Sequence, residues 1–184
     1  MDRGFTVWFT GLSGAGKSTI TGQLVEVIRA RRGNAEVLDG DVVRTHLSQG
    51  LGYSKEDRDT NIRRIGWVSS RLARAGAAVV VSAISPYEEA RRRVRVLVEE
   101  HAPFVEIHVA TLLEVCEKRD PKGLYAKARA GEIDQFTGVS DPYEVPANPE
   151  LRLDTAGREP AESAASVLAR LEELEVIAAR ESVS

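Results

Sequence analysis

Residues 11–19 read Gly-Leu-Ser-Gly-Ala-Gly-Lys-Ser-Thr, and this stretch decides the fold. It matches the pattern Gly-x-x-x-x-Gly-Lys-[Ser/Thr] at every fixed position. An apolar, β-type run at residues 5–10 precedes it, and a helical pattern with Ile20, Leu24 and Ile28 four residues apart follows it. Strand, glycine-rich loop and helix in this order are the context in which the pattern binds phosphate. The sequence therefore predicts a phosphate-binding loop between a strand and a helix.

The residue types of this loop suit a nucleotide phosphate. Glycines let the backbone curl so that successive N–H groups point at phosphate oxygens, and the helix that follows adds the positive end of its dipole. Lys17 supplies a mobile cation for the outer phosphates, and Ser18 supplies a hydroxyl for Mg²⁺. We therefore expect a nucleoside triphosphate and Mg²⁺ at this loop.

Composition bounds the class of protein. The chain has 184 residues, which is the size of one domain, with 42% hydrophobic and 29% charged residues. Its formal net charge is -3, so no global basic field attracts nucleic acid. No apolar run approaches ~18 residues, and the N-terminus does not have the pattern of a signal peptide. The single cysteine, Cys116, lies in an apolar helical pattern and is interpreted as a packing residue. We expect a cytoplasmic protein that binds neither nucleic acid nor membrane.

Apolar β-type runs alternate with amphipathic helical runs along the chain. This alternation predicts an α/β fold with a parallel five-stranded sheet and helices on both faces, the phosphate-loop NTPase architecture. The predicted strands are residues 5–10, 35–38, 77–82, 104–109 and 151–154. Among the helices, one begins after an N-cap at Ser54, one opens at Pro86, and a last one starts near Pro160.

Residues 120–148 interrupt the alternation. The segment is rich in glycine and proline, and it also carries Lys122, Tyr125 and Phe136. A loop of this length inside a compact domain is usually functional or disordered, and the aromatic residues argue against disorder. We interpret residues 1–184 as one domain in which residues 120–148 form a lid over the phosphate loop.

Charged side chains follow the predicted strands at the edge where ligands bind in an open parallel sheet. Asp39 and Asp41 flank a glycine after the second strand, which suggests Mg²⁺ coordination and a base for an acceptor hydroxyl. They can also serve as helix caps in a turn. Residues 82–86, Ser-Ala-Ile-Ser-Pro, follow the third strand.

Arginines on two helical patterns have different predicted roles. Arg58 and Asn61 are three residues apart and therefore share a helix face, and Arg58 together with Arg44 is suited to clamp an anionic acceptor. Residues 91–95 carry four arginines, balanced by glutamates at either end of the same helix. We interpret this cluster as a solvated helix face.

The chain lacks the Asn-Lys-x-Asp motif by which GTPases recognise guanine, and it is short for an ATPase motor. A small-molecule kinase fits these observations best. The sequence also resembles the adenylylsulfate kinase family over about residues 5–153. The resemblance rests on GLSGAGKST at 11–19, DGDVVR at 39–44, GLGYSKEDRDTNIRRIG at 50–66, SAISPY at 82–87, and the paired motifs EVCEKRDPKGLYAKARAGEI and FTGVSDPYEVP after residue 113.

The resemblance implies an ATP-dependent kinase that phosphorylates the 3′-hydroxyl of adenylyl sulfate. It implies ATP and Mg²⁺ as cofactor and metal, with Ser18, Asp39 and Asp41 at the metal and Lys17, Asp39, Asp41 and Ser85 in catalysis. The nucleotide-binding residues that it implies are Gly11, Ser13, Gly14, Ala15, Gly16, Lys17, Ser18, Thr19 and Arg119. The acceptor-binding residues that it implies are Asp41, Arg44, Tyr53, Arg58, Asn61, Ile84, Ser85, Lys122 and Phe136, with Phe136 stacked on the adenine.

Some residues depart from the family's pattern. Tyr53 replaces a more usual phenylalanine, Ala110-Thr111-Leu112 replaces a more usual Asp-x-Pro, and Asp134-Gln135 stands where many relatives have a lysine before Phe136. These departures keep open a diverged kinase that acts on another nucleotide-like or natural-product hydroxyl. A non-catalytic nucleotide-binding regulatory module is the alternative from another class. The resemblance also implies a homodimer and leaves room for association with an ATP sulfurylase.

Overall fold

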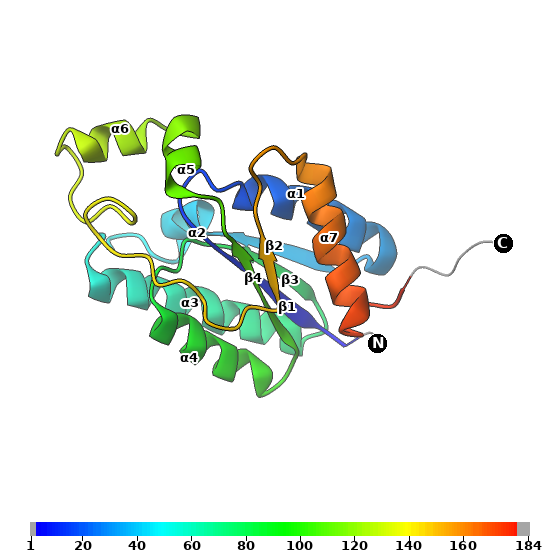
Figure 1. The fold of residues 1–184 in the computed structure, drawn as a ribbon. Helices are drawn as coiled ribbons and strands as arrows, with labels where there is room; N and C mark the ends of the chain where they lie inside the picture. The colour runs from blue at the N-terminus through cyan, green and yellow to red at the C-terminus, as the bar shows by residue number, and fades with distance from the viewer. Residues whose placement is uncertain (1–2, 180–184) are drawn as a thin grey trace.

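The computed structural model describes residues 3–179. Its centre is a five-stranded parallel sheet with the strand order β2-β3-β1-β4-β5 (Figure 1). The strands are β1 (Phe5–Thr10), β2 (Ala35–Asp39), β3 (Ala78–Ser82), β4 (Phe104–Val109) and β5 (Leu151–Leu153). The predicted α/β class and the five strands are confirmed, with boundaries that differ by at most one residue.

Helices cover both faces of this sheet (Figure 1). One face carries α1 (Lys17–Arg32) and α7 (Pro160–Glu173), which pack against each other. The other carries α3 (Lys55–Arg74) and α4 (Glu88–Glu99), which form a second packed pair. Three short helices, α2 (Gly40–His46), α5 (Leu113–Arg119) and α6 (Leu124–Arg129), lie toward the end of the sheet where β1 leads into α1. None of the helices within residues 3–179 is long and apolar enough to cross a membrane.

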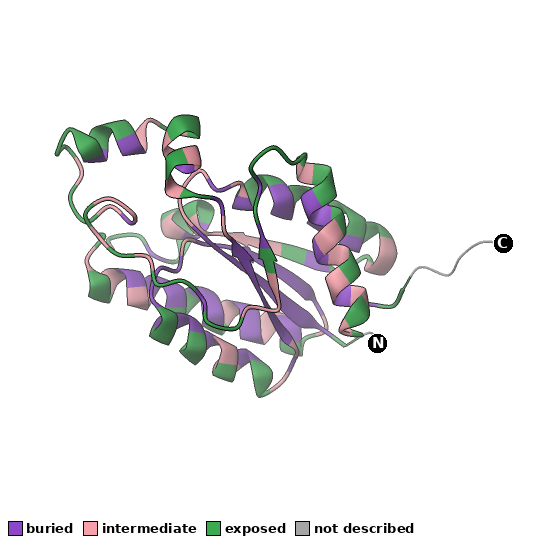
Figure 2. Cartoon of the chain, viewed as in Figure 1, coloured by how far each residue is buried: buried purple, intermediate pink, exposed green. Residues whose placement is uncertain are grey.

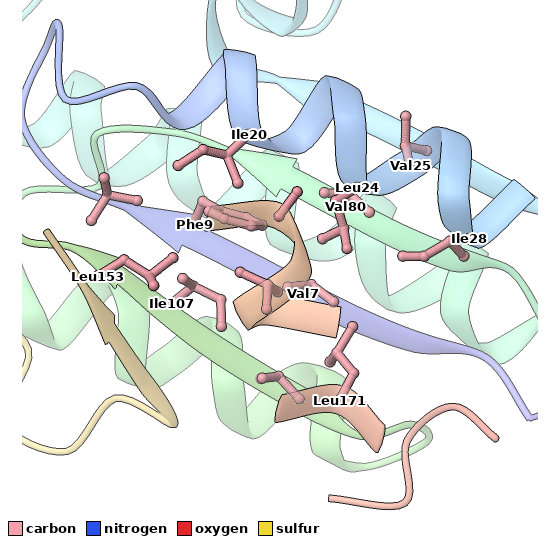
Figure 3. Packing of buried hydrophobic residues seen from close by; sticks show 14 of the residues in the cluster. Val7, Phe9, Ile20, Leu24, Val25, Ile28, Val80, Ile107, Leu153 and Leu171 are labelled. Carbon is pink, nitrogen blue, oxygen red and sulfur yellow. The ribbon is translucent and has the colours of Figure 1, made fainter. Parts of the chain in front are cut away.

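Strand β1 shows how the alternation of side chains builds two cores. Val7 and Phe9 point to the α1 and α7 side, where they pack with Leu24 and Leu171 (Figure 3). Trp8, between them, belongs to the core on the α3 and α4 side. Successive residues of a strand point to opposite faces, so a strand covered on both faces is apolar throughout. The three central strands, β1, β3 and β4, are accordingly buried along their whole length (Figure 2).

The helix starts were predicted with mixed success. Ser54 caps α3 as expected, and its hydroxyl oxygen accepts a hydrogen bond from the Asp57 backbone N–H at 3.1 Å. Helix α4 begins at Glu88 rather than at Pro86. The Pro86 carbonyl accepts a hydrogen bond from the Glu144 N–H at 2.8 Å, so it is paired with a distant segment and not with the helix.

Residues 120–148 contain regular secondary structure and are not one long loop. They contain α6, which begins after Gly123 in a left-handed conformation with φ 65°. The Asp120 carboxylate accepts hydrogen bonds from the Tyr125 and Ala126 backbone N–H groups, at 3.1 and 3.0 Å. These bonds satisfy donors that the first turn of a helix leaves unpaired, which explains a helix inside a glycine-rich segment.

The chain order places the phosphate loop at the centre of the sheet. From β1 the chain crosses to β2 on one side, and β4 later pairs with β1 on the other side. Ligands of open parallel sheets bind outside the carboxyl ends of the strands where the strand order reverses. The loop after β1 lies at this point, and a site is expected there.

Candidate active site

A cavity of about 590 Å³ opens at the carboxyl ends of the strands. The phosphate loop contributes Ser13, Gly14, Gly16, Lys17, Ser18 and Thr19 to its wall. The chain after β2, β3 and β5, segment 120–148, and residues at or near the N-termini of α1, α3 and α7 and the C-terminus of α5 contribute the remainder. The two predicted loop residues Gly11 and Ala15 do not line the cavity.

The phosphate loop needs glycine where its backbone turns. Gly11 has φ 151°, and a Cβ there would lie 2.6 Å from the Val109 carbonyl oxygen. Gly16 has φ 102° and caps the start of α1. Both conformations are strained for a residue with a side chain, so the glycines hold the curled backbone that the motif requires.

Lys17 is buried beneath this loop. Its Nζ donates hydrogen bonds to the Gly11 and Leu12 carbonyl oxygens, at 2.9 and 2.8 Å. Burial lowers the pKa of Lys17 from 10.5 to about 8, and the charges of Asp39 and Asp41 act in the opposite direction. The Lys17 ammonium group is therefore held at the loop, and part of its positive charge remains available to a polyanionic ligand.

Ser18, Asp39 and Ser82 bring oxygen atoms together beside Lys17. The Ser18 hydroxyl donates to the Asp39 carboxylate at 2.7 Å, and the Ser18 and Ser82 hydroxyl oxygens lie 3.2 Å apart. Asp39 also caps α2, because its other carboxylate oxygen accepts from the Asp41 N–H at 3.0 Å. The capping interpretation of this aspartate is therefore confirmed, and its second carboxylate oxygen remains directed at Ser18.

These oxygen atoms fit Mg²⁺. Proteins usually bind this ion through one or two carboxylates or hydroxyls together with substrate phosphates and water, rather than through a full cage of side chains. Residues 3–179 accordingly hold no cluster of three or more His, Cys, Asp or Glu side chains suited to a metal. A hydroxyl and a carboxylate next to a phosphate loop are the donor set that a nucleotide-bound Mg²⁺ uses.

Asp41 faces segment 120–148 across the cavity. Its carboxylate forms an ion pair with Lys122, and this hydrogen bond raises the pKa of Lys122. Both side chains are mostly exposed, so the pair is weak and exchangeable. The structure thus brings together two residues that are far apart in the sequence and that were both predicted at the acceptor site.

Arg58 is placed at the acceptor side but is already well bonded. It lines the cavity together with Tyr53, Ile84 and Phe136. Its guanidinium donates to the Tyr53 carbonyl at 2.8 Å, to the Thr137 hydroxyl at 2.5 Å and to the Gln135 carbonyl. Arg58 therefore fastens the segment that carries Phe136, in addition to facing the cavity.

Three predicted acceptor residues do not line this cavity. Arg44 stacks on the Tyr53 ring, 4.5 Å from its centroid, and donates to the Gly52 carbonyl at 3.0 Å. Asn61 is buried on α3. Ser85 is buried, and its hydroxyl oxygen accepts from Trp8 Nε1 at 3.1 Å. The side chain of Ser85 is thus directed into the core under the site.

Arg119 reaches the other end of the cavity, where two residues missed in the sequence also lie. It donates to the Thr155 hydroxyl and carbonyl oxygens, both at 2.8 Å, and the Thr155 hydroxyl donates to the Ala15 carbonyl at 2.9 Å. Arg158 also lines this end. Thr155 follows β5 directly, so the rule that ligands bind at strand ends would have found it.

The predicted lid segment touches the phosphate loop. The Tyr125 hydroxyl donates to the Ser13 carbonyl at 3.0 Å, and the Tyr125 and Phe136 rings pack edge to face with centroids 5.0 Å apart. Asp134, whose charge raised the question of a different acceptor, is exposed and does not line the cavity.

The prediction of a solvated arginine face on α4 is wrong for two of the four arginines. Arg92 and Arg93 are exposed and pair with Glu89, as expected. Arg91 is only 2% exposed and pairs with Glu106 of β4 at 2.9 Å, and Arg95 pairs with Glu150 at 2.8 Å. Arg91 lies three residues before the buried Val94 on the same helix face, so it must point at the sheet.

The fold and the site together define a phosphate-loop nucleotide-binding protein of the kinase type. The defining features are a parallel sheet, a phosphate loop with its lysine, and a carboxylate beyond the next strand. The family model described as "Adenylylsulphate kinase" matches residues 3–154. The chain belongs to the adenylylsulphate kinase family.

Individual relatives agree with this assignment. An "Adenylyl-sulfate kinase" of Picosynechococcus sp. is 58% identical over 94% of this chain and 96% of its own length. The Mycobacterium tuberculosis APS kinase CysC in complex with AMPPNP and APS superposes with a TM-score of 0.88, at 49% identity, over 94% of this chain and 99% of that one. A "Probable bifunctional SAT/APS kinase 2" of Sorangium cellulosum is 56% identical over 93% of this chain but only 29% of its own length.

Proposed function

We propose that this chain transfers the γ-phosphoryl group of ATP to the 3′-hydroxyl of adenylyl sulfate and releases ADP and 3′-phosphoadenylyl sulfate. The observation that carries this proposal is a single cavity lined by both the phosphate loop with Lys17 and the acceptor-side residues Tyr53, Arg58 and Phe136. A shared cavity lets the two substrates meet without water between them.

The proposed ATP-binding residues are Lys17, Ser18, Thr19 and Arg119, together with the backbone of residues 11–16. The Lys17 ammonium group lies where it can exchange its carbonyl partners for phosphate oxygens. Ser18 and Asp39 would hold Mg²⁺, which supplies charge neutralisation at the phosphates when bound. Arg119 and Thr155 would face the adenosine end of the donor.

Asp41 is the proposed base. The 3′-oxygen of the acceptor attacks the γ-phosphorus, the bond from that phosphorus to the β-phosphate oxygen breaks, and the hydroxyl proton passes to the Asp41 carboxylate. Asp41 lines the cavity and is exposed on the side facing Lys122. Binding of the anionic acceptor would free Asp41 by giving Lys122 a new partner.

The proposed acceptor pocket is formed by Tyr53, Arg58, Ile84, Lys122 and Phe136, which line the cavity opposite the phosphate loop. Phe136 offers a ring on which the acceptor adenine can stack. Arg44, Asn61 and Ser85 would act here through the residues that they contact. The exposed position of Asp134 gives no support to a diverged acceptor.

Segment 120–148 is the proposed lid, because it combines a carboxylate-bound lysine, an aromatic ring and a contact to the phosphate loop. The proposals of a homodimer and of a cytoplasmic location rest on the resemblance and on a single, buried, unpaired cysteine. The long Sorangium relative, whose name pairs two activities, supports the proposal that an ATP sulfurylase associates with this chain.

The decisive experiment is an assay of ADP release with Mg²⁺ and ATP, with and without adenylyl sulfate. We expect turnover only when adenylyl sulfate is present, and a product that carries a new 3′-phosphate. Turnover only with another nucleotide-like acceptor would establish the diverged kinase. Nucleotide binding without turnover by any acceptor would establish a regulatory module.

A further inference from the structure

Arg91 lies directly beneath residues 82–86, which we call the acceptor loop. Its Nη1 donates to the Ser85 carbonyl at 2.7 Å, and its Nη2 donates to the Glu144 carbonyl at 2.7 Å. Its Nε pairs with Glu106 of β4 at 2.9 Å. One guanidinium group therefore joins β4, the acceptor loop and the C-terminal part of segment 120–148, the proposed lid.

The acceptor loop needs such support because its backbone is strained. Ser85 has φ 42°, a left-handed conformation that costs a residue with a side chain about 1–3 kcal/mol and persists only where surrounding contacts enforce it. The residue before it, Ile84, lines the cavity at the proposed acceptor side. The backbone conformation of Ser85 therefore determines the position of Ile84 in the cavity wall.

The acceptor loop is also held by β1 and by the phosphate loop, whose Gly11 N–H donates to the Ile84 carbonyl at 3.5 Å. The Thr10 hydroxyl donates to the Ile84 carbonyl at 2.7 Å, and the Trp8 indole donates to the Ser85 hydroxyl at 3.1 Å. Arg91 holds the same loop through the Ser85 carbonyl, and Glu144 is anchored to the loop through its N–H, which donates to the Pro86 carbonyl. Arg91 is the charged member of this network, and a planar fork can meet two carbonyls and a carboxylate at once.

The carboxylate of Glu106 compensates the charge of the buried Arg91. Glu106 is 8% exposed, and burial raises its pKa, while Arg91 and Arg95 act to lower it. A buried pair contributes less to stability than its Coulomb attraction suggests, because both charges lose water. The ion pair between Arg91 and Glu106 instead fixes the direction in which the Arg91 guanidinium group points.

We propose that Arg91 is a positioning residue for the acceptor site, which holds the Ser85 backbone in its left-handed conformation and thereby places Ile84 in the acceptor wall. The inference rests on the proposed function for its kinetic consequence. Arg91 touches neither the phosphate loop nor the proposed ATP side in the contacts described. Its loss should therefore affect the acceptor and spare the donor.

The test compares Arg91→Met and Arg91→Lys with the matched control Arg95→Met. Arg95 lies on the same helix and pairs with Glu99, Glu106 and Glu150, but none of its described contacts reaches residues 82–86. We expect Arg91→Met to raise the KM for adenylyl sulfate about tenfold or more, since small misplacements of a binding wall are costly. The KM for ATP should change less than about twofold. Arg91→Lys should have a smaller effect in the same direction, because lysine keeps the charge but lacks the fork.

Arg95→Met should leave the ratio of the two KM values unchanged, even where it lowers Tm as much as Arg91→Met does. A folded Arg91→Met enzyme with an unchanged ratio would overturn the proposal, as would an equal shift in Arg95→Met. A second measurement is independent of turnover: hydrogen exchange of a peptide spanning residues 82–87 should accelerate in Arg91→Lys and not in Arg95→Lys. If the wild type fails to phosphorylate adenylyl sulfate, the proposed function fails, and the exchange result alone decides the role of Arg91. Unchanged exchange in Arg91→Lys would contradict that role.

Discussion

At the scale of single residues, Lys17 is the proposed carrier of the donor chemistry. Lys17→Ala should abolish phosphoryl transfer, because the ammonium group neutralises charge on the transferring phosphoryl, an effect of several kcal/mol. The measurement is ADP release, with Tm recorded for the same preparation. Lys118→Ala is the control, since Lys118 is exposed on α5 and does not line the cavity. Near-normal turnover in a folded Lys17→Ala enzyme would contradict the assignment of the phosphate loop.

The lowered pKa of Lys17 has a consequence for pH dependence. Burial lowers this pKa to about 8, so the free enzyme loses the cation as the pH rises through that value. We expect kcat/KM for ATP, which reports the free enzyme, to fall above about pH 8. The fall in kcat should come at higher pH, because bound phosphates stabilise the charged lysine. A flat kcat/KM profile from about pH 7 to 10 would contradict the prediction.

The same shift predicts a change in stability. Between pH 8 and 10.5 the native state has released a proton that the unfolded state still holds. The free energy of unfolding contributed by Lys17 therefore rises with pH over this range and is constant below it. Urea unfolding of the wild type and Lys17→Met should diverge there, and parallel curves would show that Lys17 is not buried in the free protein.

Asp41 tests the acceptor chemistry. Asp41→Asn should keep nucleotide binding but lose on the order of 10²-fold or more in turnover, as expected for a general base. Asp134→Asn is the matched control, because Asp134 is an exposed aspartate of segment 120–148 that does not line the cavity. If Asp39→Asn is crippling while Asp41→Asn is mild, the roles of the two aspartates are the reverse of those proposed.

At the scale of elements, segment 120–148 connects Phe136, the proposed acceptor residue, to the phosphate loop. Phe136 packs on Tyr125, and Tyr125 bonds to the phosphate loop through Ser13. Phe136→Ala should raise the KM for adenylyl sulfate, because stacking of a base on an aromatic ring contributes about 1–3 kcal/mol. Phe136→Trp, which keeps a stacking surface, should retain most of the affinity. A change confined to the KM for ATP would show that Phe136 faces the donor.

At the scale of the whole molecule, α7 closes the core over the centre of the sheet. Leu171 is fully buried against the side chains of β1 and β4 (Figure 3). Leu171→Ala should lower the free energy of unfolding by about 2–5 kcal/mol without changing either KM. The control is Leu112→Ala, the same change at a side chain that is 60% exposed. Equal losses in chemical denaturation would contradict the role of α7 in the core.

The sequence by itself determined the class of the sheet, the phosphate loop and the aspartates beyond β2. These features are local, because strand, loop and helix are contiguous around residues 11–19. Continuous apolar runs also predict which strands are covered by helices on both faces. The parallel direction of the strands brings the carboxyl end of every strand to one edge, which is why residues after different strands were expected to meet.

Only the tertiary structure decided what each polar side chain contacts. Arg91 was predicted on a solvated face; its spacing from Val94 could have placed it on the buried face of α4, but its partners Ser85, Glu106 and Glu144 come from three separate segments. The same holds for Arg58, which meets Gln135 and Thr137 across the cavity. A buried arginine is stable only when distant groups satisfy its donors, and local sequence patterns carry no record of which distant groups the folded chain supplies.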